Sequence, residues 1–279
     1  MAYKTVLVHL NDERRAGRVI NAGIEIARAF DAHLIGLYVM PLARMVSPLP
    51  TAFTADVIGR IKTALKEDVE KIKKIFDEMT ANQPFVAEWR SITTEQRDTS
   101  SIVLEHARAA DLTIASQADP SWSMTYLLDV ADELTLGSGG PVLVVPNAGA
   151  PWQRMPRTIT VGWNGRRESA RAIHDALPLL KLAEKVYVLT VPEDEAREGA
   201  LPDTEIGAAL ARHGVNVQIS KEPASQFTVG EELLVRSTRL QSDMLVMGCY
   251  GHSRLREFAL GGVTRHILRD ATISVLFSH

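Results

Sequence analysis

The sequence has little of several features that would mark a specialised class of protein. Cys249 is the single cysteine among 279 residues, which excludes an intramolecular disulfide and a thiolate metal cluster and fits a reducing compartment. No apolar run is long enough for a membrane span. The 31 basic and 34 acidic residues give a net charge of -3, so nothing attracts the chain to nucleic acid or to an anionic membrane. We therefore expect a cytoplasmic globular protein with neither partner.

Standard catalytic signatures are also missing from the sequence. There is no glycine-lysine-serine/threonine phosphate loop, no glycine-rich dinucleotide fingerprint after the first strand of either half, and no glycine-x-serine-x-glycine elbow. The eight histidines include no pair at the spacing of a zinc-binding helix. We expect no catalytic residue and no metal ligand, which leaves at most a weak ATPase.

What the sequence does contain is an internal repeat. Lys4–Val8 matches Arg157–Val161 at an offset of 153, and Asp111–Ile114 matches Asp243–Val246 at an offset of 132. The offsets differ by 21 residues, which the first copy carries between its second and third strands. The chain is therefore two copies of one unit.

The two copies meet in a short linker, Pro146–Pro151, whose prolines and glycine cannot continue a helix or strand. We place the domains at 1–150 and 151–279. Hydrophobic residues make up 46% of the chain and charged residues 23%, which is enough apolar material for a real core.

Within each copy, short apolar runs alternate with amphipathic stretches, which predicts an α/β fold with a five-stranded parallel sheet and helices on both faces. The expected strands are 5–10, 33–40, 85–91, 112–116, 141–145, 158–163, 186–191, 215–220, 244–247 and 273–277. The expected helices are 16–30, 57–79, 100–109, 123–134, 169–183, 202–213, 229–240 and 263–269. The apolar stripe of helix 57–79 favours packing on its own sheet, with contact to a partner chain as the alternative.

A glycine-rich segment follows the fourth strand of the second copy. Gly248 and Gly251 are separated by two residues, nine more residues precede Gly261, and Gly262 then opens a helix. Glycine at a strand end lets backbone N–H groups approach an anion, and the first turn of a helix offers unpaired N–H donors. Ligands of open parallel sheets bind at this edge, where the strand order reverses. The segment predicts a polyphosphate site; tight turns without a ligand are the alternative.

These residues resemble the universal stress protein family, whose members have small flavodoxin-like nucleotide-binding domains. The resemblance covers nearly the whole chain as two tandem copies, and it implies ATP or ADP, with or without Mg²⁺, in the second copy. The nucleotide-binding residues that it implies are Asn164, Val191, Met247, Gly248, Gly251, Gly261, Gly262, Val263 and Thr264.

Two of these positions depart from the family pattern. Asn164 stands where the family has an aspartate, which removes a charge and adds an N–H donor. Gly262 stands where the family has serine or threonine, so one hydroxyl donor to phosphate is lost, a change of about 1 kcal/mol. The hydroxyl of Thr264, on the same first turn, offers a substitute.

The first copy lacks the glycines. The equivalents of Gly248, Gly251, Gly261, Gly262 and Thr264 are Ser116, Asp119, Asp129, Val130 and Asp132. Three carboxylates repel a polyphosphate, so we expect this copy to be degenerate and not to bind nucleotide. An apolar pocket lined by Trp122, Met124 and Tyr126 is the alternative.

Several other residues keep two interpretations. Cys249 is either a redox-active thiol, with its pKa lowered by a helix start, or a variable loop residue. His252, Arg254 and Arg256 either meet a γ-phosphate or face water. Asn11 and Asp12 are expected to cap the first helix.

The function expected from these features and from the family resemblance is that of a nucleotide-binding stress-response or regulatory module with an unknown protein partner. The alternatives are a slow ATP hydrolase that uses Arg254 or His252, and a nucleotide-free interaction scaffold. The apolar fifth strands, 141–145 and 273–277, would expose a sheet edge unless they pair. The resemblance implies that they pair in an internal pseudo-dimer, and a further homodimer is left open.

Overall fold

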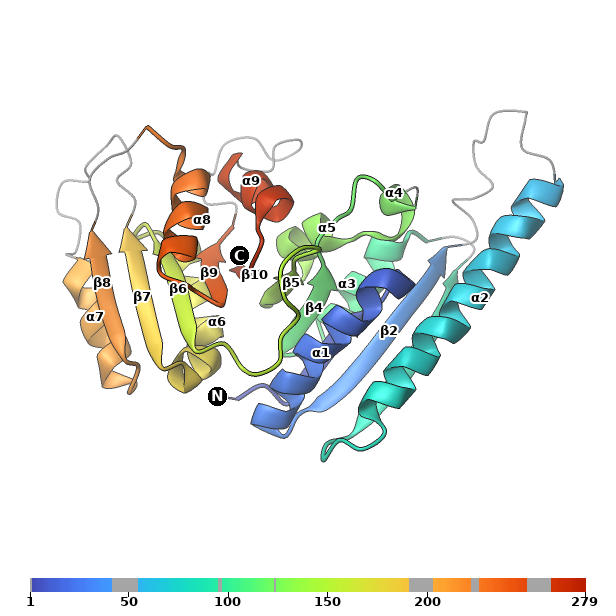
Figure 1. Cartoon of the computed structure of the whole chain (residues 1–279), viewed down its shortest axis with the longest axis horizontal. Helices are drawn as coiled ribbons and strands as arrows, with labels where there is room; N and C mark the ends of the chain where they lie inside the picture. Colours follow the sequence, from blue (N-terminus) through green and yellow to red (C-terminus); the bar gives the residue numbers. More distant parts are fainter. Residues whose placement is uncertain are drawn as a thin grey trace.

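The computed structural model describes residues 2–41, 55–94, 97–122, 124–190, 203–221, 226–249 and 262–279. Within them, ten strands form one continuous sheet in the order β3-β2-β1-β4-β5-β10-β9-β6-β7-β8 (Figure 1). The strands are β1 (Thr5–His9), β2 (His33–Pro41), β3 (Ala87–Thr94), β4 (Leu112–Ser116), β5 (Val142–Val145), β6 (Thr158–Trp163), β7 (Lys185–Thr190), β8 (Val217–Lys221), β9 (Met244–Gly248) and β10 (Ser274–Ser278). Each predicted strand corresponds to one of them.

The helices connect these strands in both halves. They are α1 (Glu13–Phe30), α2 (Ala55–Thr80), α3 (Thr99–Ala107), α4 (Thr125–Leu128), α5 (Ala131–Gly137), α6 (Arg167–Leu182), α7 (Asp203–Arg212), α8 (Val229–Arg239) and α9 (Gly262–Asp270). All predicted helices are present except that the one expected at 123–134 is two short helices, α4 and α5. No helix in the described part of the chain is both long and apolar enough for a membrane crossing.

The two halves join through their fifth strands. Neighbouring strands are parallel within each half, whereas β5 and β10 pair antiparallel, with Leu143 opposite Leu276 and Val144 opposite Val275. This pairing confirms the expected internal pseudo-dimer, and it satisfies the backbone groups of two apolar strands that would otherwise form sheet edges.

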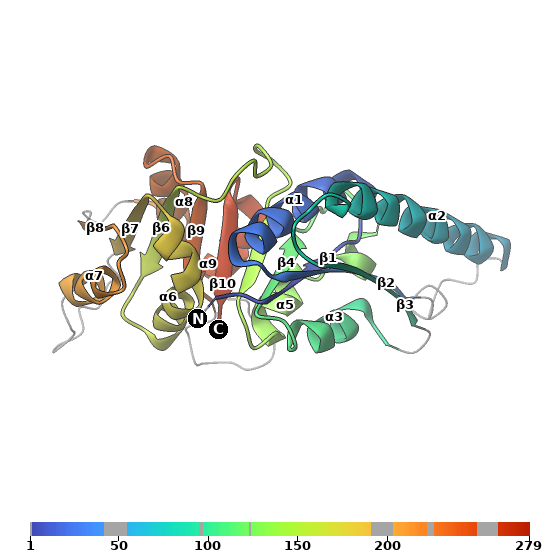
Figure 2. The same cartoon turned by 90° about the horizontal axis from the view of Figure 1, so that it is seen from below.

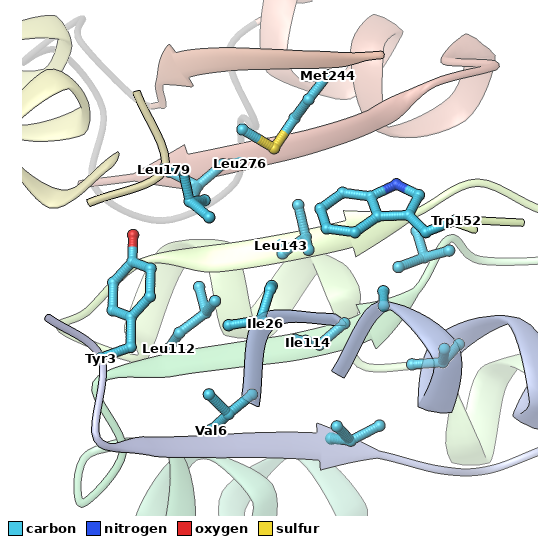
Figure 3. Close-up of a cluster of buried hydrophobic side chains, with 14 of the residues drawn as sticks. Tyr3, Val6, Ile26, Leu112, Ile114, Leu143, Trp152, Leu179, Met244 and Leu276 are labelled. Atoms are coloured by element: carbon cyan, nitrogen blue, oxygen red, sulfur yellow. The ribbon is translucent and has the colours of Figure 1, made fainter. Parts of the chain in front are cut away.

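Apolar side chains cover both faces of the sheet, because strands buried on both sides are nearly continuous runs of Val, Ile and Leu. Helices α1, α2, α6 and α7 pack on one face, and α3, α5, α8 and α9 pack on the other. The apolar core beneath α1, α2, α6 and α7 continues across the pairing of β5 with β10. In Figure 3, Leu143, Leu276 and Trp152 lie together in this core. In α2, the side chains of Leu65, Val69, Ile72 and Phe76 are buried against this core, which supports packing of the helix on its own sheet.

The linker and the residues near both chain ends form hydrogen bonds with the helices and strands of the protein. The indole of Trp152 donates to Ser274 Oγ at 3.0 Å, and Asn21 donates to the Trp152 carbonyl. Near the chain ends, Tyr3 donates its hydroxyl to the Asp175 carbonyl at 2.6 Å and Ser278 donates to the Asp175 carboxylate. Both ends therefore lie beside α6 (Figures 1 and 2).

The break between α4 and α5 corrects the prediction of one helix at 123–134. Asp129 has extended backbone angles, φ -78° and ψ 133°. In that conformation its carboxylate accepts hydrogen bonds from Asn11, just before α1, from Arg15 in α1, and from the backbone N–H of Asp119. These long-range contacts outweigh the local preference for a continuous helix.

Candidate functional site

Several predicted residues of the C-terminal half converge at the carboxyl edge of its sheet. The strand order there is β10-β9-β6-β7-β8, so the chain reverses direction across the sheet between β6 and β9. Met247 pairs with Gly162, Gly248 ends β9, and Asn164 follows the last residue of β6. Because β6 and β9 are parallel, Asn164 and Gly248 leave the sheet at the same edge.

Gly248 is required by a close approach of two backbones. A Cβ at this position would lie 2.4 Å from the carbonyl carbon of Glu168 and 2.6 Å from the Ser169 nitrogen, both in the first turn of α6. Backbone atoms cannot move aside as a flexible side chain can. The end of β9 is thus held against the start of α6, at the position where doubly wound sheets bind ligands.

Helix α9 brings its first turn to this same edge. Only residues 271–273 separate the end of α9 from β10, which runs parallel to β9, so α9 runs antiparallel to the strands. Gly262 is exposed, and a Cβ there would meet no atom of the described residues within 4 Å. Val263 is half-buried and the side chain of Thr264 is buried, so at the start of the helix the main chain of Gly262 is exposed.

Two polar residues shape the turn between β6 and α6. Asn164 Oδ1 accepts from the backbone N–H of Arg166 at 3.1 Å, and Gly165 has φ of 69°, in the left-handed region. Glu168 is buried beside Gly248. Burial opposes its ionisation, but the hydrogen bond from Arg167 and the nearby positive charges lower its pKa. Sequence reasoning missed Glu168, because its backbone contact with Gly248 spans 80 residues.

Other predicted residues lie outside the described ranges or elsewhere in the fold. Val191, Gly251, Gly261, His252, Arg254 and Arg256 lie outside the described residues. Within those ranges, no three His, Cys, Asp or Glu side chains are grouped so that they could hold a metal ion.

Cys249 is a core residue. Its thiol is 1% exposed and donates to the carbonyls of Thr135 at 3.2 Å and Ser278 at 3.3 Å. Burial raises the pKa of this thiol to about 12. The redox interpretation is therefore wrong. Cys249 follows the last residue of β9, and its buried thiol joins this end of the strand to α5 of the other half.

The equivalent edge of the N-terminal half is filled by its own side chains. Asp129 Oδ1 accepts from Arg15 Nη2 at 2.7 Å and from Asn11 Nδ2 at 2.6 Å, while Oδ2 accepts from the backbone N–H of Asp119 at 3.0 Å. Arg15 also donates to Asp12 at 3.0 Å. The carboxylate of Asp129 thus binds the backbone N–H of Asp119, the residue equivalent to Gly251.

Arginines lie beside three carboxylates of this edge, Asp12, Asp119 and Asp129. For Asp12, burial opposes ionisation, but hydrogen bonds from Arg14 and the charges of Arg15 and Arg14 outweigh it and lower the pKa. For Asp119, the hydrogen bond from Ser121 is the main cause of a lowered pKa, and the two arginines add to it. Of the three carboxylates that the sequence places at this edge, Asp129 pairs with Arg15 and Asp119 lies 3.6 Å from Arg14, whereas burial raises the pKa of Asp132. An ion-paired carboxylate therefore occupies this edge.

Three other expectations for this half can be compared with the structure. Asp12 is the N-cap of α1, as expected, but Asn11 is not a cap, because it binds Asp129 and the Leu128 carbonyl instead. The ring of Trp122 lies over the Arg15 guanidinium, 4.7 Å from ring centroid to Cζ, so it covers a charged group. The apolar pocket is thus contradicted at Trp122; Met124 packs against the core, and the side chain of Tyr126 lies outside the described residues.

This architecture defines the class of protein: a tandem, doubly wound α/β protein of flavodoxin-like fold. Residues 155–279 match the Universal stress protein family. This match covers the C-terminal half of the chain.

Solved structures extend the likeness in fold to the whole chain. A universal stress protein from Archaeoglobus fulgidus DSM 4304 is 12% identical over 98% of this chain and 95% of its own, with a TM-score of 0.73. A functionally unknown protein from Pseudomonas aeruginosa PAO1 is 14% identical over 99% of this chain and 92% of its own, with a TM-score of 0.60. No curated protein matches the chain.

A shorter structure is known with a nucleotide. The universal stress protein from Archaeoglobus fulgidus in complex with dAMP is 16% identical and covers 52% of this chain and 98% of its own, with a TM-score of 0.31.

Proposed function

We propose that the C-terminal half binds ATP or ADP at the carboxyl edge of β6 and β9, and that the N-terminal half does not bind nucleotide. The observation that carries the proposal is the contrast between the two edges. Buried Asp129, paired with Arg15, fills one of them. The other has Gly248 at the end of β9 and the exposed main chain of Gly262 at the start of α9.

The phosphate groups would be held by backbone N–H donors. The first turn of α9 carries N–H groups without intrahelical partners at the positive end of the helix dipole. The exposed main chain of Gly262 would offer its N–H there, and Gly251 and Gly261 would extend the same cradle. Because the Thr264 side chain is 3% exposed, main-chain donors rather than its hydroxyl carry the proposed contact.

The nucleoside would lie nearer to β6. Asn164 follows β6, and Val191 and Met247 would flank the nucleoside from the neighbouring strand ends. One lone pair of Asn164 Oδ1 is engaged by the Arg166 N–H, so the second lone pair and the amide nitrogen are the groups offered to a ribose hydroxyl.

At the level of the cell, we propose a cytoplasmic stress-response or regulatory module. The match of residues 155–279 to the Universal stress protein family supports this role, and the buried Cys249 suits a reducing compartment. Nucleotide occupancy would change the surface that a protein partner reads at the carboxyl edge of the C-terminal half.

The test is calorimetric titration of ATP into the wild-type chain, Gly262→Asp and the matched control Gly262→Ala. The wild type should bind one ATP per chain. Gly262→Asp should bind at least about tenfold more weakly, because its carboxylate repels the phosphates and competes for the same donors. It should nevertheless fold normally, since a Cβ enters open space and an acidic side chain favours a helix start. Gly262→Ala should bind ATP as the wild type does.

Two results would contradict the proposal. A wild-type chain that binds no ATP would favour the nucleotide-free scaffold. Equal binding by the wild type and Gly262→Asp would place any nucleotide away from the first turn of α9.

A further inference from the structure

We infer that Gln117, in the N-terminal half, is a positioning residue for the nucleotide site of the C-terminal half; the inference rests on the proposed function. Gln117 follows β4 and is 5% exposed. Its side-chain nitrogen lies 3.0 Å from the Leu268 carbonyl, 2.9 Å from that of Arg269 and 3.2 Å from that of Ala271. Its side-chain oxygen accepts from the Asn147 N–H at 3.0 Å.

These three carbonyls belong to the C-terminal end of α9 and the residue after it. The last carbonyls of a helix have no intrahelical partner and need donors from elsewhere. Among the described residues, no water-sized cavity remains in the space lined by Gln117, Leu268 and Ala271, so there is no room for a water beside the side-chain amide. Gln117 is therefore a cap for α9 that comes from the other half of the chain.

Capping one end of α9 fixes the other end. The helix has nine residues, or about 14 Å at 1.5 Å per residue, so its last turn and its first turn move as one rigid unit. Its first turn carries Gly262, at the edge where the phosphates are proposed to bind. Gln117 would thus hold the N–H donors of α9 in place without touching the nucleotide.

Gln117 is itself anchored by the network that fills the N-terminal edge. Its backbone carbonyl accepts from Arg15 Nη1 at 2.8 Å, and its N–H donates to the Val145 carbonyl at 2.8 Å. Arg15 is the same residue that pairs with Asp129. Arg15, which pairs with Asp129, therefore also holds Gln117, the residue that caps α9. The N-terminal half would thus contribute to nucleotide binding by the C-terminal half.

The reciprocal contact is weaker. Cys249, the first residue after β9, occupies the position equivalent to Gln117 and donates its thiol to the Thr135 carbonyl in α5. A thiol is a weak donor, whereas an amide nitrogen carries two N–H groups. The stronger cap is on α9, the helix that faces the proposed nucleotide.

The experiment compares ATP affinity and amide hydrogen exchange of ligand-free α9 in four proteins: wild type, Gln117→Leu, Gln117→Glu and Val69→Ala. Gln117→Leu removes the donors and should weaken ATP binding about tenfold and speed exchange in α9. Val69 is buried in α2, away from α9, so Val69→Ala should lower the melting temperature while the ATP affinity and the exchange of α9 stay at the wild-type values. This control separates positioning from loss of stability.

Gln117→Glu supplies a pH profile that a purely structural role would not produce. A protonated carboxyl can donate to a carbonyl, whereas a carboxylate cannot. Relative to the wild type at the same pH, Gln117→Glu should bind ATP almost normally at pH 5.5 and about tenfold more weakly at pH 8.5.

The outcomes separate the inference from the proposed function. If the wild type binds ATP and Gln117→Leu binds it equally well, the inference is overturned and the proposed function stands. If the wild type binds no ATP, the proposed function is wrong and the positioning role is overturned with it.

Discussion

The guanidinium of Arg15 lies 2.7 Å from the carboxylate of Asp129, 114 residues later in the chain, and both side chains are buried, at 8% and 4% exposure. This pair occupies the carboxyl edge of the N-terminal half, which corresponds to the edge where Gly248 ends β9 in the C-terminal half. It connects α1 to the break between α4 and α5. The two halves therefore share a fold but differ in what occupies their carboxyl edges.

Removal of Asp129 should be strongly destabilising. In Asp129→Ala, Arg15 keeps Asp12 but loses its other buried carboxylate, so we expect the free energy of unfolding to fall by about 3 kcal/mol, measured by urea denaturation. The control is Arg97→Ala, which breaks an exposed pair with Glu105 and should leave the urea midpoint unchanged. Equal stability of Asp129→Ala and the wild type would contradict the account of this edge.

His9 should make stability depend on pH. Burial, with a smaller contribution from the charge of Arg15, lowers the pKa of His9 to about 3 from 6.5, and its buried Nε2 has no hydrogen-bond partner among the described residues. Between those pH values the unfolded chain takes up a proton that the folded chain does not. The free energy of unfolding should therefore fall by about 1.4 kcal/mol per pH unit as the pH drops below 6.5.

The His9 effect is measured as a difference between two proteins. Urea denaturation of the wild type and His9→Leu from pH 7.5 to pH 4.5 should give a steeper loss of stability in the wild type. The pKa of His106 is also lowered by burial, so a residual slope should persist in the variant. Parallel pH profiles of the two proteins would rule out a neutral, buried His9.

Gly248→Ala should destabilise the C-terminal half. The added methyl group would collide with the backbone of Glu168 and Ser169, and overpacking of this kind costs about 1–3 kcal/mol. We expect a lower melting temperature, measured by calorimetry, and weaker ATP binding because the end of β9 is displaced. Gly262→Ala is the matched control, since its methyl group enters open space and should leave the melting temperature unchanged or higher. A Gly248→Ala protein as stable as this control would show that the close approach is absent.

Cys249 should be inert in the folded protein. With a thiol pKa of about 12 and 1% exposure, it should react with an aromatic disulfide reagent at pH 8 at least about a thousandfold more slowly than an exposed thiol. The same reagent should label it fully in concentrated guanidinium chloride. Labelling of the folded chain at the rate of a free thiol would restore the redox interpretation.

The sequence predicted those parts of the fold that depend on local pattern. Apolar runs such as Val142–Val145 and Ser274–Ser278 are buried on both faces, and this pattern identified them as strands. Their pairing was expected from the family resemblance, but not its antiparallel direction. The glycines and Asn164 were correctly placed at one edge where they lie in the described residues, because the strand order follows from the alternation of strands and helices.

Residues whose partners lie far along the chain were not predictable from local pattern. Asp129 breaks a helix to reach Arg15, and Asn11 leaves the capping role to Asp12 for the same reason. Gln117 has no local signature, since its partners in α9 are more than 150 residues away. Cys249 lies beside a glycine in the sequence but in the core of the fold.

Hydrogen exchange with and without ATP tests the division between the two halves most directly. We predict that ATP slows exchange of the backbone amides in α9, residues 262–268, and leaves residues 117–132 of the N-terminal half unchanged. Slower exchange at 117–132 with no change in α9 would contradict the account.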